Sequence, residues 1–267
     1  MDFINTFYKK MIFYFSGTGN SAHAAQRLAQ LLDDKVKNIA DYYDTIKKGV
    51  EVSLKGESYL GIVCPVHSWG LAKPVVRFLK KVRFTDCDVA KAYCVVTCGD
   101  TCGTADKQVK GLLKRRNSIV CEHVYSVQMP NTYIVMKGFG TDADVLRDQK
   151  LTNAEPELAR IAEAISTGSD YEHYVRGKKP FLKGRILYPL FMAFTMGDKK
   201  FYAEDSCNGC GLCAKLCPEK NIAMARKRPN WLGHCVKCLS CIHRCPKRAI
   251  QFGDVTQDMG RYYYKQD

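Results

Sequence analysis

The chain has 267 residues, a formal net charge of +14 and 14 cysteines. This length allows two domains with full cores, and no apolar run approaches the ~18–20 residues that a membrane-spanning helix needs. The first residues lack the basic, apolar and small-residue regions of a secretory signal, so we expect a cytoplasmic protein with reduced thiols.

The positive charge is concentrated toward the C-terminus. Residues 171–267 contain 18 Lys and Arg against 8 Asp and Glu, a net charge of +10, whereas the preceding 170 residues carry only +4. A basic surface favours an acidic partner. No nucleic-acid motif is present and the lysines are not interleaved with aromatic residues, so we expect no nucleic acid partner.

The first motif lies between an apolar segment at residues 10–15 and an amphipathic segment that begins at Ala22. The intervening residues 16–21 read S-G-T-G-N-S, and a strand, a glycine loop and a helix in this order predict a phosphate site. Two ligands fit these residues. The pattern Gly17-x-Gly19-x-x-Ala22, with Asp41 downstream, satisfies a loose dinucleotide fingerprint. The neutral hydroxyl and amide donors of the loop suit a phosphate monoester.

The same alternation of strand and helix continues along the chain. Further strands are predicted at residues 36–40, 59–64, 90–98 and 119–128, and a closing helix at residues 152–167. This order predicts an α/β fold with a doubly wound, parallel, five-stranded sheet. The loops 16–21, 65–70 and 98–103 then lie at the carboxyl ends of their strands, where such sheets bind ligands.

The S-G-T-G-N-S loop, in this order of elements, resembles the phosphate loop of flavodoxins. The resemblance implies an FMN cofactor whose ring lies between the second and third loops. The residues implied for the phosphate are Ser16, Gly17, Thr18, Gly19, Asn20 and Ser21. Those implied for the two sides of the ring are Val66, His67, Ser68, Trp69 and Gly70, and Gly99, Asp100, Thr101 and Gly103.

A cysteine repeat dominates the last third of the chain. The pattern C-x2-C-x2-C-x3-C-P occurs twice, at a spacing of 28 residues, which is the arrangement that holds two [4Fe–4S] clusters with the fourth cysteine of each run crossing to the other cluster. The first predicted set is Cys207, Cys210, Cys213 and Cys245; the second is Cys217, Cys235, Cys238 and Cys241. Structural zinc and a disulfide framework fit this spacing poorly. Residues 201–253 resemble bacterial-type two-cluster ferredoxins, which implies a small α+β domain.

These features divide the chain into three parts: residues 1–168 as the FMN domain, 169–200 as a basic and apolar linker, and 201–267 as the cluster domain. Residues 181–196 are apolar but interrupted by Gly184 and Pro189, and our preferred interpretation is that they pack between the two domains. A basic and apolar stretch also suits a membrane surface, which is the second interpretation.

The whole chain resembles the flavodoxin–ferredoxin fusion proteins of anaerobes. The resemblance implies an electron carrier that couples one-electron partners to a two-electron acceptor. The alternative is a reductase whose FMN acts directly on a small-molecule acceptor. A reductase needs a general acid near the flavin, and His67 and Asp100 are the two candidates by position. The sequence assigns no other catalytic residue.

Overall fold

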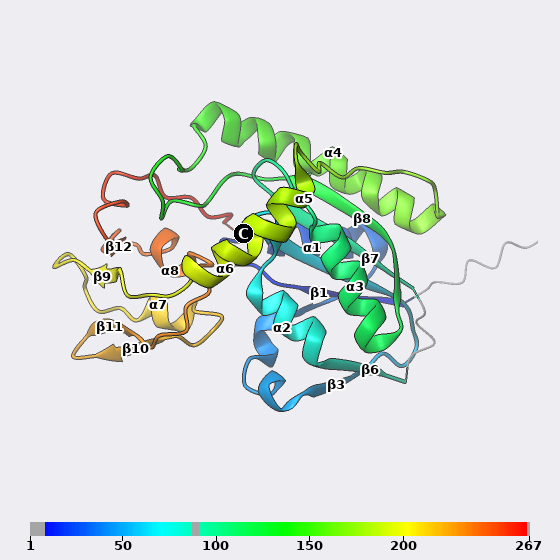
Figure 1. Cartoon of the computed structure of the whole chain (residues 1–267), viewed down its shortest axis with the longest axis horizontal. Coiled ribbons are helices and arrows are strands. Elements are labelled where there is room, and N and C mark those ends of the chain that lie inside the picture. The colour runs from blue at the N-terminus through cyan, green and yellow to red at the C-terminus, as the bar shows by residue number, and fades with distance from the viewer. Residues whose placement is uncertain (1–8, 87–90, 266–267) are drawn as a thin grey trace, which may run out of the picture.

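The computed structural model describes residues 9–86 and 91–265. It contains a helix-covered sheet and a smaller unit with short strands, which lie side by side (Figure 1). One further segment, residues 180–194, crosses the front of the molecule between the two.

The large sheet is parallel along its main path, in the order β2-β1-β4-β7-β8. Numbered along the chain, these five strands follow the order 2-1-3-4-5 of the flavodoxin-like doubly wound fold. The predicted fold class is therefore confirmed. The strands are β1 (Lys9–Tyr14), β2 (Lys35–Asn38), β4 (Glu57–His67), β7 (Lys91–Cys98) and β8 (Val120–Gln128), and Ala90 of the predicted fourth strand lies outside the described residues.

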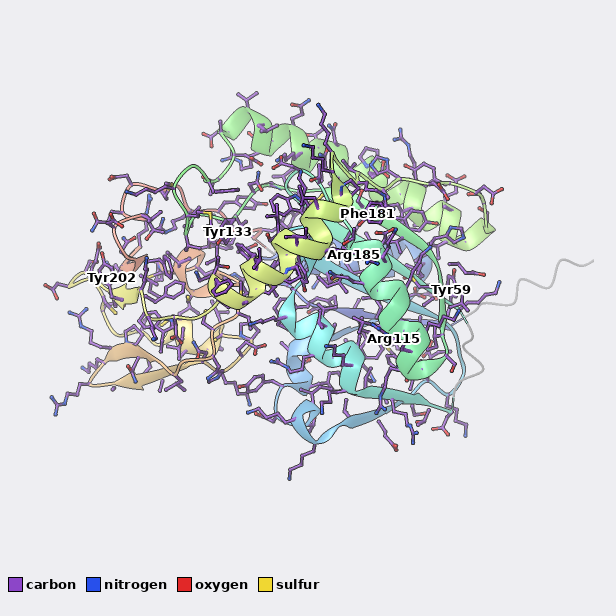
Figure 2. The ribbon with its side chains drawn as sticks, viewed as in Figure 1. Tyr59, Arg115, Tyr133, Phe181, Arg185 and Tyr202 are labelled. Atoms are coloured by element: carbon purple, nitrogen blue, oxygen red, sulfur yellow. The ribbon has the colours of Figure 1, made fainter. Side chains whose placement is uncertain are left out.

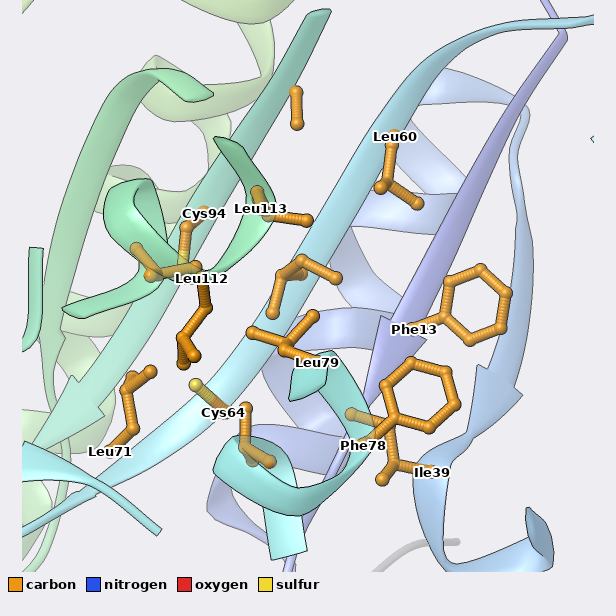
Figure 3. Packing of buried hydrophobic residues seen from close by; sticks show 14 of the residues in the cluster. Phe13, Ile39, Leu60, Cys64, Leu71, Phe78, Leu79, Cys94, Leu112 and Leu113 are labelled. Atoms are coloured by element: carbon orange, nitrogen blue, oxygen red, sulfur yellow. The ribbon is translucent and has the colours of Figure 1, made fainter. Parts of the chain in front are cut away.

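Two pairs of helices cover the two faces of this sheet. The helices α1 (Asn20–Leu32) and α4 (Asp144–Thr167) pack on one face, and α2 (Lys73–Lys81) and α3 (Ala105–Asn117) on the other. Successive strand residues alternate between the faces, so that Phe13 and Leu60 meet Phe78, Leu79 and Leu112 in one core (Figure 3). Both layers are needed because a parallel sheet buries both of its faces.

Several short elements were not predicted. β3 (Val50–Ser53) and β6 (Val82–Thr85) form a small parallel pair beside the main sheet. Val82 begins β6 directly after α2 ends at Lys81. The remaining short elements of this part are η1 (Ile39–Tyr42), η2 (Ile46–Lys48) and β5 (Gly70–Leu71), which pairs with the end of β4.

The smaller unit reflects the 28-residue repeat. Its two antiparallel pairs are β9 (Phe201–Ala203) with β12 (Ile250–Phe252), and β10 (Ile222–Ala225) with β11 (Arg228–Trp231). Two single-turn helices, α7 (Leu212–Lys215) and α8 (Ser240–His243), stand 28 residues apart in the two halves. This confirms the predicted small α+β unit. Its core also takes in Ile134 and Val135 from the segment after β8.

The connecting segment is helical, with α5 (Pro180–Leu182), η3 (Lys183–Leu187) and α6 (Tyr188–Phe194) in one continuous run. It contacts the sheet domain through the Tyr188 hydroxyl, which donates to Leu71 O at 2.8 Å. It approaches the smaller unit at Gly197, whose N–H donates to Cys235 O at 3.3 Å. Among the described residues, no helix has the length and apolar character required to cross a membrane.

A buried ion pair joins the two domains directly. The two terminal guanidinium nitrogens of Arg77, on α2, donate to the carboxylate of Glu219 at 2.6 and 2.7 Å, and Glu219 is only 2% exposed. Around it, Lys220 pairs with Asp44, and the rings of Tyr43 and His234 stack. Bidentate geometry of this kind fixes orientation as well as distance.

Candidate functional site

The first cysteine set is brought together around one small cavity. Cys207, Cys210, Cys213 and Cys245 all line it, together with Pro246 and Ile250. Burial raises the pKa of Cys213, and the neighbouring thiols of Cys245 and Cys207 raise it further. The fourth cysteine of the second run therefore lies with the first three of the first run.

The second set is closer to the sheet domain and more deeply buried. Burial raises the pKa of the Cys235 thiol to about 11, and that of Cys238 and Cys241 as well. In each case nearby thiols of the same set add to the increase. Protein N–H groups also point at two of these sulfurs: Asn221 N–H donates to Cys217 Sγ at 3.2 Å and Lys237 N–H to Cys235 Sγ at 3.3 Å.

This donor set fits iron–sulfur clusters. Soft sulfur ligands of the first set surround one cavity, and the thiols of the second set lie close enough to raise one another's pKa values. N–H···S bonds are among the features by which a protein tunes cluster potential. Thiols with raised pKa values must lose their protons when a metal binds, so loading the sites releases protons.

The loop 16–21 is held rigidly at the start of α1. Gly19 has a φ of 99°, which favours glycine, and its N–H donates to the Ser16 hydroxyl at 3.0 Å. Thr18, Asn20 and Ser21 are buried. The Asn20 amide donates to Pro130 O at 3.0 Å, and the hydroxyls of Ser21 and Thr97 share a hydrogen bond of 2.7 Å.

A cavity of about 300 Å³ opens between this loop and the smaller domain. From the loop, Ser16, Gly17 and Gly19 line it. The opposite wall carries the cations Lys215, Lys220 and Arg244 and also Cys217 of the second cysteine set. Asn38, Ala40, Asp41, Leu216, Pro218 and Ser240 complete the lining.

Three properties of this cavity fit an anionic group. The N-terminus of the 13-residue helix α1 faces it, with its free N–H groups and positive dipole end. Three cationic side chains line it. The Arg244 Nε is buried and has no hydrogen-bond partner among the described residues. A volume of this order matches small-molecule sites.

The C-terminal tail covers the other side of the loop. Tyr264 N–H donates to Thr18 O at 2.8 Å, and the Tyr262 hydroxyl donates to the Asn20 side-chain oxygen at 3.0 Å. The Tyr264 ring stacks on His23 with centroids 4.1 Å apart. A Cβ on Gly19 would lie 2.6 Å from Tyr264 O, so the tail can lie this close only because that residue is glycine.

The loops 65–70 and 98–103 lie against each other and do not line this cavity. Thr104 N–H donates to Trp69 O at 3.2 Å, and Gly103 lies so close that an added Cβ would be 2.5 Å from Trp69 Cβ. Ser68 and Trp69 both have positive φ angles, 50° and 68°. Two consecutive non-glycine residues in this conformation are strained, which is characteristic of functional loops.

The remaining residues implied for the ring differ in exposure. Val66, His67, Ser68 and Trp69 are half-buried, as are Gly99 and Thr101, whereas Gly70 and Gly103 are buried and Asp100 is exposed. Burial lowers the pKa of His67 to about 4, so its imidazole is neutral near pH 7. Of the fifteen residues implied for the cofactor, only Ser16, Gly17 and Gly19 line the cavity.

Sequence reasoning missed the second wall of the site. Lys215 and Arg244, on this wall, and Tyr262, in the tail on the other side of the loop, carry no local pattern that points to the loop 16–21. Gly17 is the one residue of the loop whose type relates to this wall. A Cβ there would lie 2.3 Å from Cys238 O, so the glycine allows the second cysteine set to approach the loop. A glycine that is explained by the phosphate-type loop can therefore also be required by a packing contact with the other domain.

The comparison with protein families identifies the smaller domain. Residues 199–246 match the family described as "4Fe-4S dicluster domain". This match spans both cysteine runs. No curated protein matches the chain.

Solved structures similar to the chain cover about half of it or somewhat more. One is the Trp repressor binding protein from Bacillus subtilis, with 16% identity over 56% of this chain and 96% of that one, at a TM-score of 0.37. A short-chain flavodoxin associated with a bacterial microcompartment shows 15% identity over 61% and 99% of the two chains, at a TM-score of 0.35. Rubredoxin oxygen:oxidoreductase from Desulfovibrio gigas shows 14% identity over 60% and 37%, at a TM-score of 0.34. The strand order, rather than these low overall scores, identifies the fold of the sheet domain.

Proposed function

We propose that this flavodoxin–ferredoxin fusion is an electron-transfer protein that holds two [4Fe–4S] clusters and one FMN and passes electrons between them. When bound, the clusters supply one-electron chemistry and the flavin supplies one- or two-electron chemistry, so their combination couples one-electron carriers to a two-electron acceptor. The residues of the chain would set the distance between the clusters and the flavin, the access of partners to them and the charge around them.

One observation carries this proposal: the phosphate-type loop and Cys217 of the second cysteine set line the same cavity. Ser16 and Gly17 lie on one wall, Cys217 lies on the other, and Gly17 is in direct contact with the Cys238 backbone. The Arg77–Glu219 pair holds the two walls together two residues from Cys217. A shared, rigid cavity favours transfer within one molecule.

The loop would hold the FMN phosphate. The Ser16 hydroxyl, the N–H groups at the start of α1 and the orphaned Nε of Arg244 are donors of the kind that bind phosphate oxygens. Cys207, Cys210, Cys213 and Cys245 would hold one cluster, and Cys217, Cys235, Cys238 and Cys241 the other. The residues of loops 65–70 and 98–103 stay our proposal for the flavin ring.

A direct reductase is the weaker alternative. His67 was one of two candidate acids by position, and burial lowers its pKa to about 4. A neutral imidazole is a poor proton donor at neutral pH. The other candidate, Asp100, is exposed and has Lys150 at 3.9 Å. Neither observation favours a small-molecule substrate over a protein partner.

The partner that exchanges electrons with the clusters would be an acidic protein. The net charge of +10 over residues 171–267 belongs to the part that contains both cysteine runs. Complementary charge mainly raises the association rate, and salt screens it.

Stopped-flow reduction tests the proposed function. A low-potential donor should reduce the clusters first, and the flavin absorbance should then fall at a rate that does not change when the protein is diluted. Independence from concentration is expected because both sites belong to one chain and share a cavity. Flavin that stays oxidised, or a rate that scales with protein concentration, would show that the two domains serve separate partners.

Ser16→Ala should weaken FMN binding by about 1–2 kcal/mol, or roughly 5- to 30-fold in Kd, through the loss of a hydrogen bond to a charged group. Ser53→Ala is the matched control, because Ser53 is exposed on β3 and remote from the cavity lining. Titration of the flavin-free protein with FMN, FAD and NAD gives the Kd values. Equal Kd values for the two variants, or preference for a dinucleotide, would contradict the assignment of the loop.

A further inference from the structure

The helical segment α5–η3–α6 turns an apolar row away from the protein. Leu182, Ile186, Leu190 and Phe194 stand four residues apart and are 45%, 51%, 48% and 80% exposed. Phe181 is 56% exposed beside them, and Figure 2 shows it with Arg185 on the part of the ribbon that crosses the front of the molecule. Among the described residues, 15 large hydrophobic side chains are exposed, and six of them lie in this segment.

The opposite face of the segment is fixed to the sheet domain. Gly184 is buried, and a Cβ there would lie 1.8 Å from the Thr104 hydroxyl oxygen, so no larger residue fits at this contact. The Tyr188 hydroxyl donates to Leu71 O at 2.8 Å. The Phe191 ring contacts the Tyr133 ring at 5.7 Å. With these contacts in place, the segment cannot roll over and bury its apolar row.

The charge around this row has a single sign. Residues 173–197 contain Arg176, Lys178, Lys179, Lys183 and Arg185 and no Asp or Glu. Lys178, Lys179 and Arg185 are exposed, and the Lys107 ammonium lies 4.1 Å from the centre of the Phe181 ring. Asp106, the acidic residue nearest to Lys107 in sequence, is already paired with Arg176 at 2.6 Å.

We infer that this face binds the surface of an anionic lipid membrane. An exposed apolar row enters the boundary between headgroups and acyl chains, and the cations beside it pair with anionic headgroups. The long Lys and Arg side chains can extend from the apolar row to the headgroups. A second copy of this chain is a poorer occupant, because a two-fold contact would place these cations against the same cations of its partner. This inference goes beyond the proposed function and does not depend on it.

Vesicle flotation of the fully loaded protein tests the inference. Vesicles of pure phosphatidylcholine are compared with vesicles that contain an equal share of phosphatidylglycerol. The wild-type chain should float with the anionic vesicles, less so as sodium chloride is raised, and only weakly with the neutral ones. The double variant Ile186→Asp, Phe194→Asp should lower the affinity by about tenfold or more, because it removes two apolar side chains that would enter the membrane and adds two negative charges.

Val145→Asp is the matched control, because Val145 is 83% exposed on α4, outside the segment, and this variant should float like the wild type. The far-ultraviolet circular dichroism of each variant reports that it is folded. The inference is overturned if the wild type does not float with anionic vesicles, or if the double variant floats equally well. It is also overturned if the chain forms a dimer that this double variant abolishes while neither floats, which would assign the face to protein contact.

Discussion

Replacing Arg77 with alanine is expected to uncouple the two domains. Arg77 makes two hydrogen bonds to Glu219, at 2.6 and 2.7 Å, and these bonds raise the pKa of its guanidinium. The carboxylate is 2% exposed, so losing Arg77 leaves a buried charge without its partner. We expect a cost of about 3 kcal/mol, toward the low end for buried pairs because the Arg77 side chain is 34% exposed.

The measurement has two parts. Thermal unfolding reports the loss of stability, and stopped-flow reduction reports whether transfer to the flavin slows and becomes dependent on protein concentration. Arg83→Ala is the matched control, since Arg83 lies on β6 and makes only an exposed pair with Glu51 at 3.9 Å. The double replacement Arg77→Met, Glu219→Met should recover much of the lost stability, because it leaves no buried charge unpaired. If Arg77→Ala behaves like Arg83→Ala, the ion pair does not hold the domains together.

Replacing Cys213 with serine is expected to halve the iron content of the protein. Cys213 lies with Cys207, Cys210 and Cys245 around one cavity, so its loss should remove one cluster and leave the other. Iron and sulfide should fall from about eight to about four per chain. The domain should also lose stability, because its core is small and metal binding contributes folding free energy in such domains.

Cys121→Ser is the control for Cys213→Ser, because it removes a buried thiol that belongs to neither cysteine set. Cys121 is 4% exposed in the core of the sheet domain, where its sulfur lies 3.6 Å from His123 O. This variant should keep its full iron content even if it unfolds at a lower temperature. Retention of all iron by Cys213→Ser, or a zinc-loaded and colourless wild type from anaerobic preparation, would contradict the two-cluster assignment.

The sheet domain could be predicted from sequence because β1, β4, β7 and β8 contain apolar runs, and glycine loops follow the first three of these strands. β3 and β6 could not, because each is four residues long and Val82 continues the apolar stripe of α2 in sequence. The cysteine sets were predicted from the repeat and from the known two-cluster arrangement. The structure places the four cysteines of the first set around one cavity, and their role as cluster ligands stays a prediction.

The docking of the two domains could not be predicted in the same way. Glu219 is in a polar stretch and reads as a surface residue, yet it is buried against Arg77, 142 residues earlier. The partner of the Asn20 amide is a backbone oxygen at Pro130, which has no sequence signature. We expected residues 181–196 to pack between the domains. One face of the segment contacts the sheet domain through Gly184 and Tyr188, and these two contacts turn the apolar row outward.

The tail contact at the phosphate loop has a consequence for the order of assembly. Asn20 and Tyr262 are 242 residues apart, so the loop leaves the ribosome long before its cover does. The sheet domain can collapse early, since domains form as units during synthesis. Throughout that interval the loop stays open to solvent on the side that Tyr262 and Tyr264 later close. The described part of the tail does not line the cavity, so a phosphate-bearing molecule that arrives after release can still reach the loop from the side that faces the smaller domain.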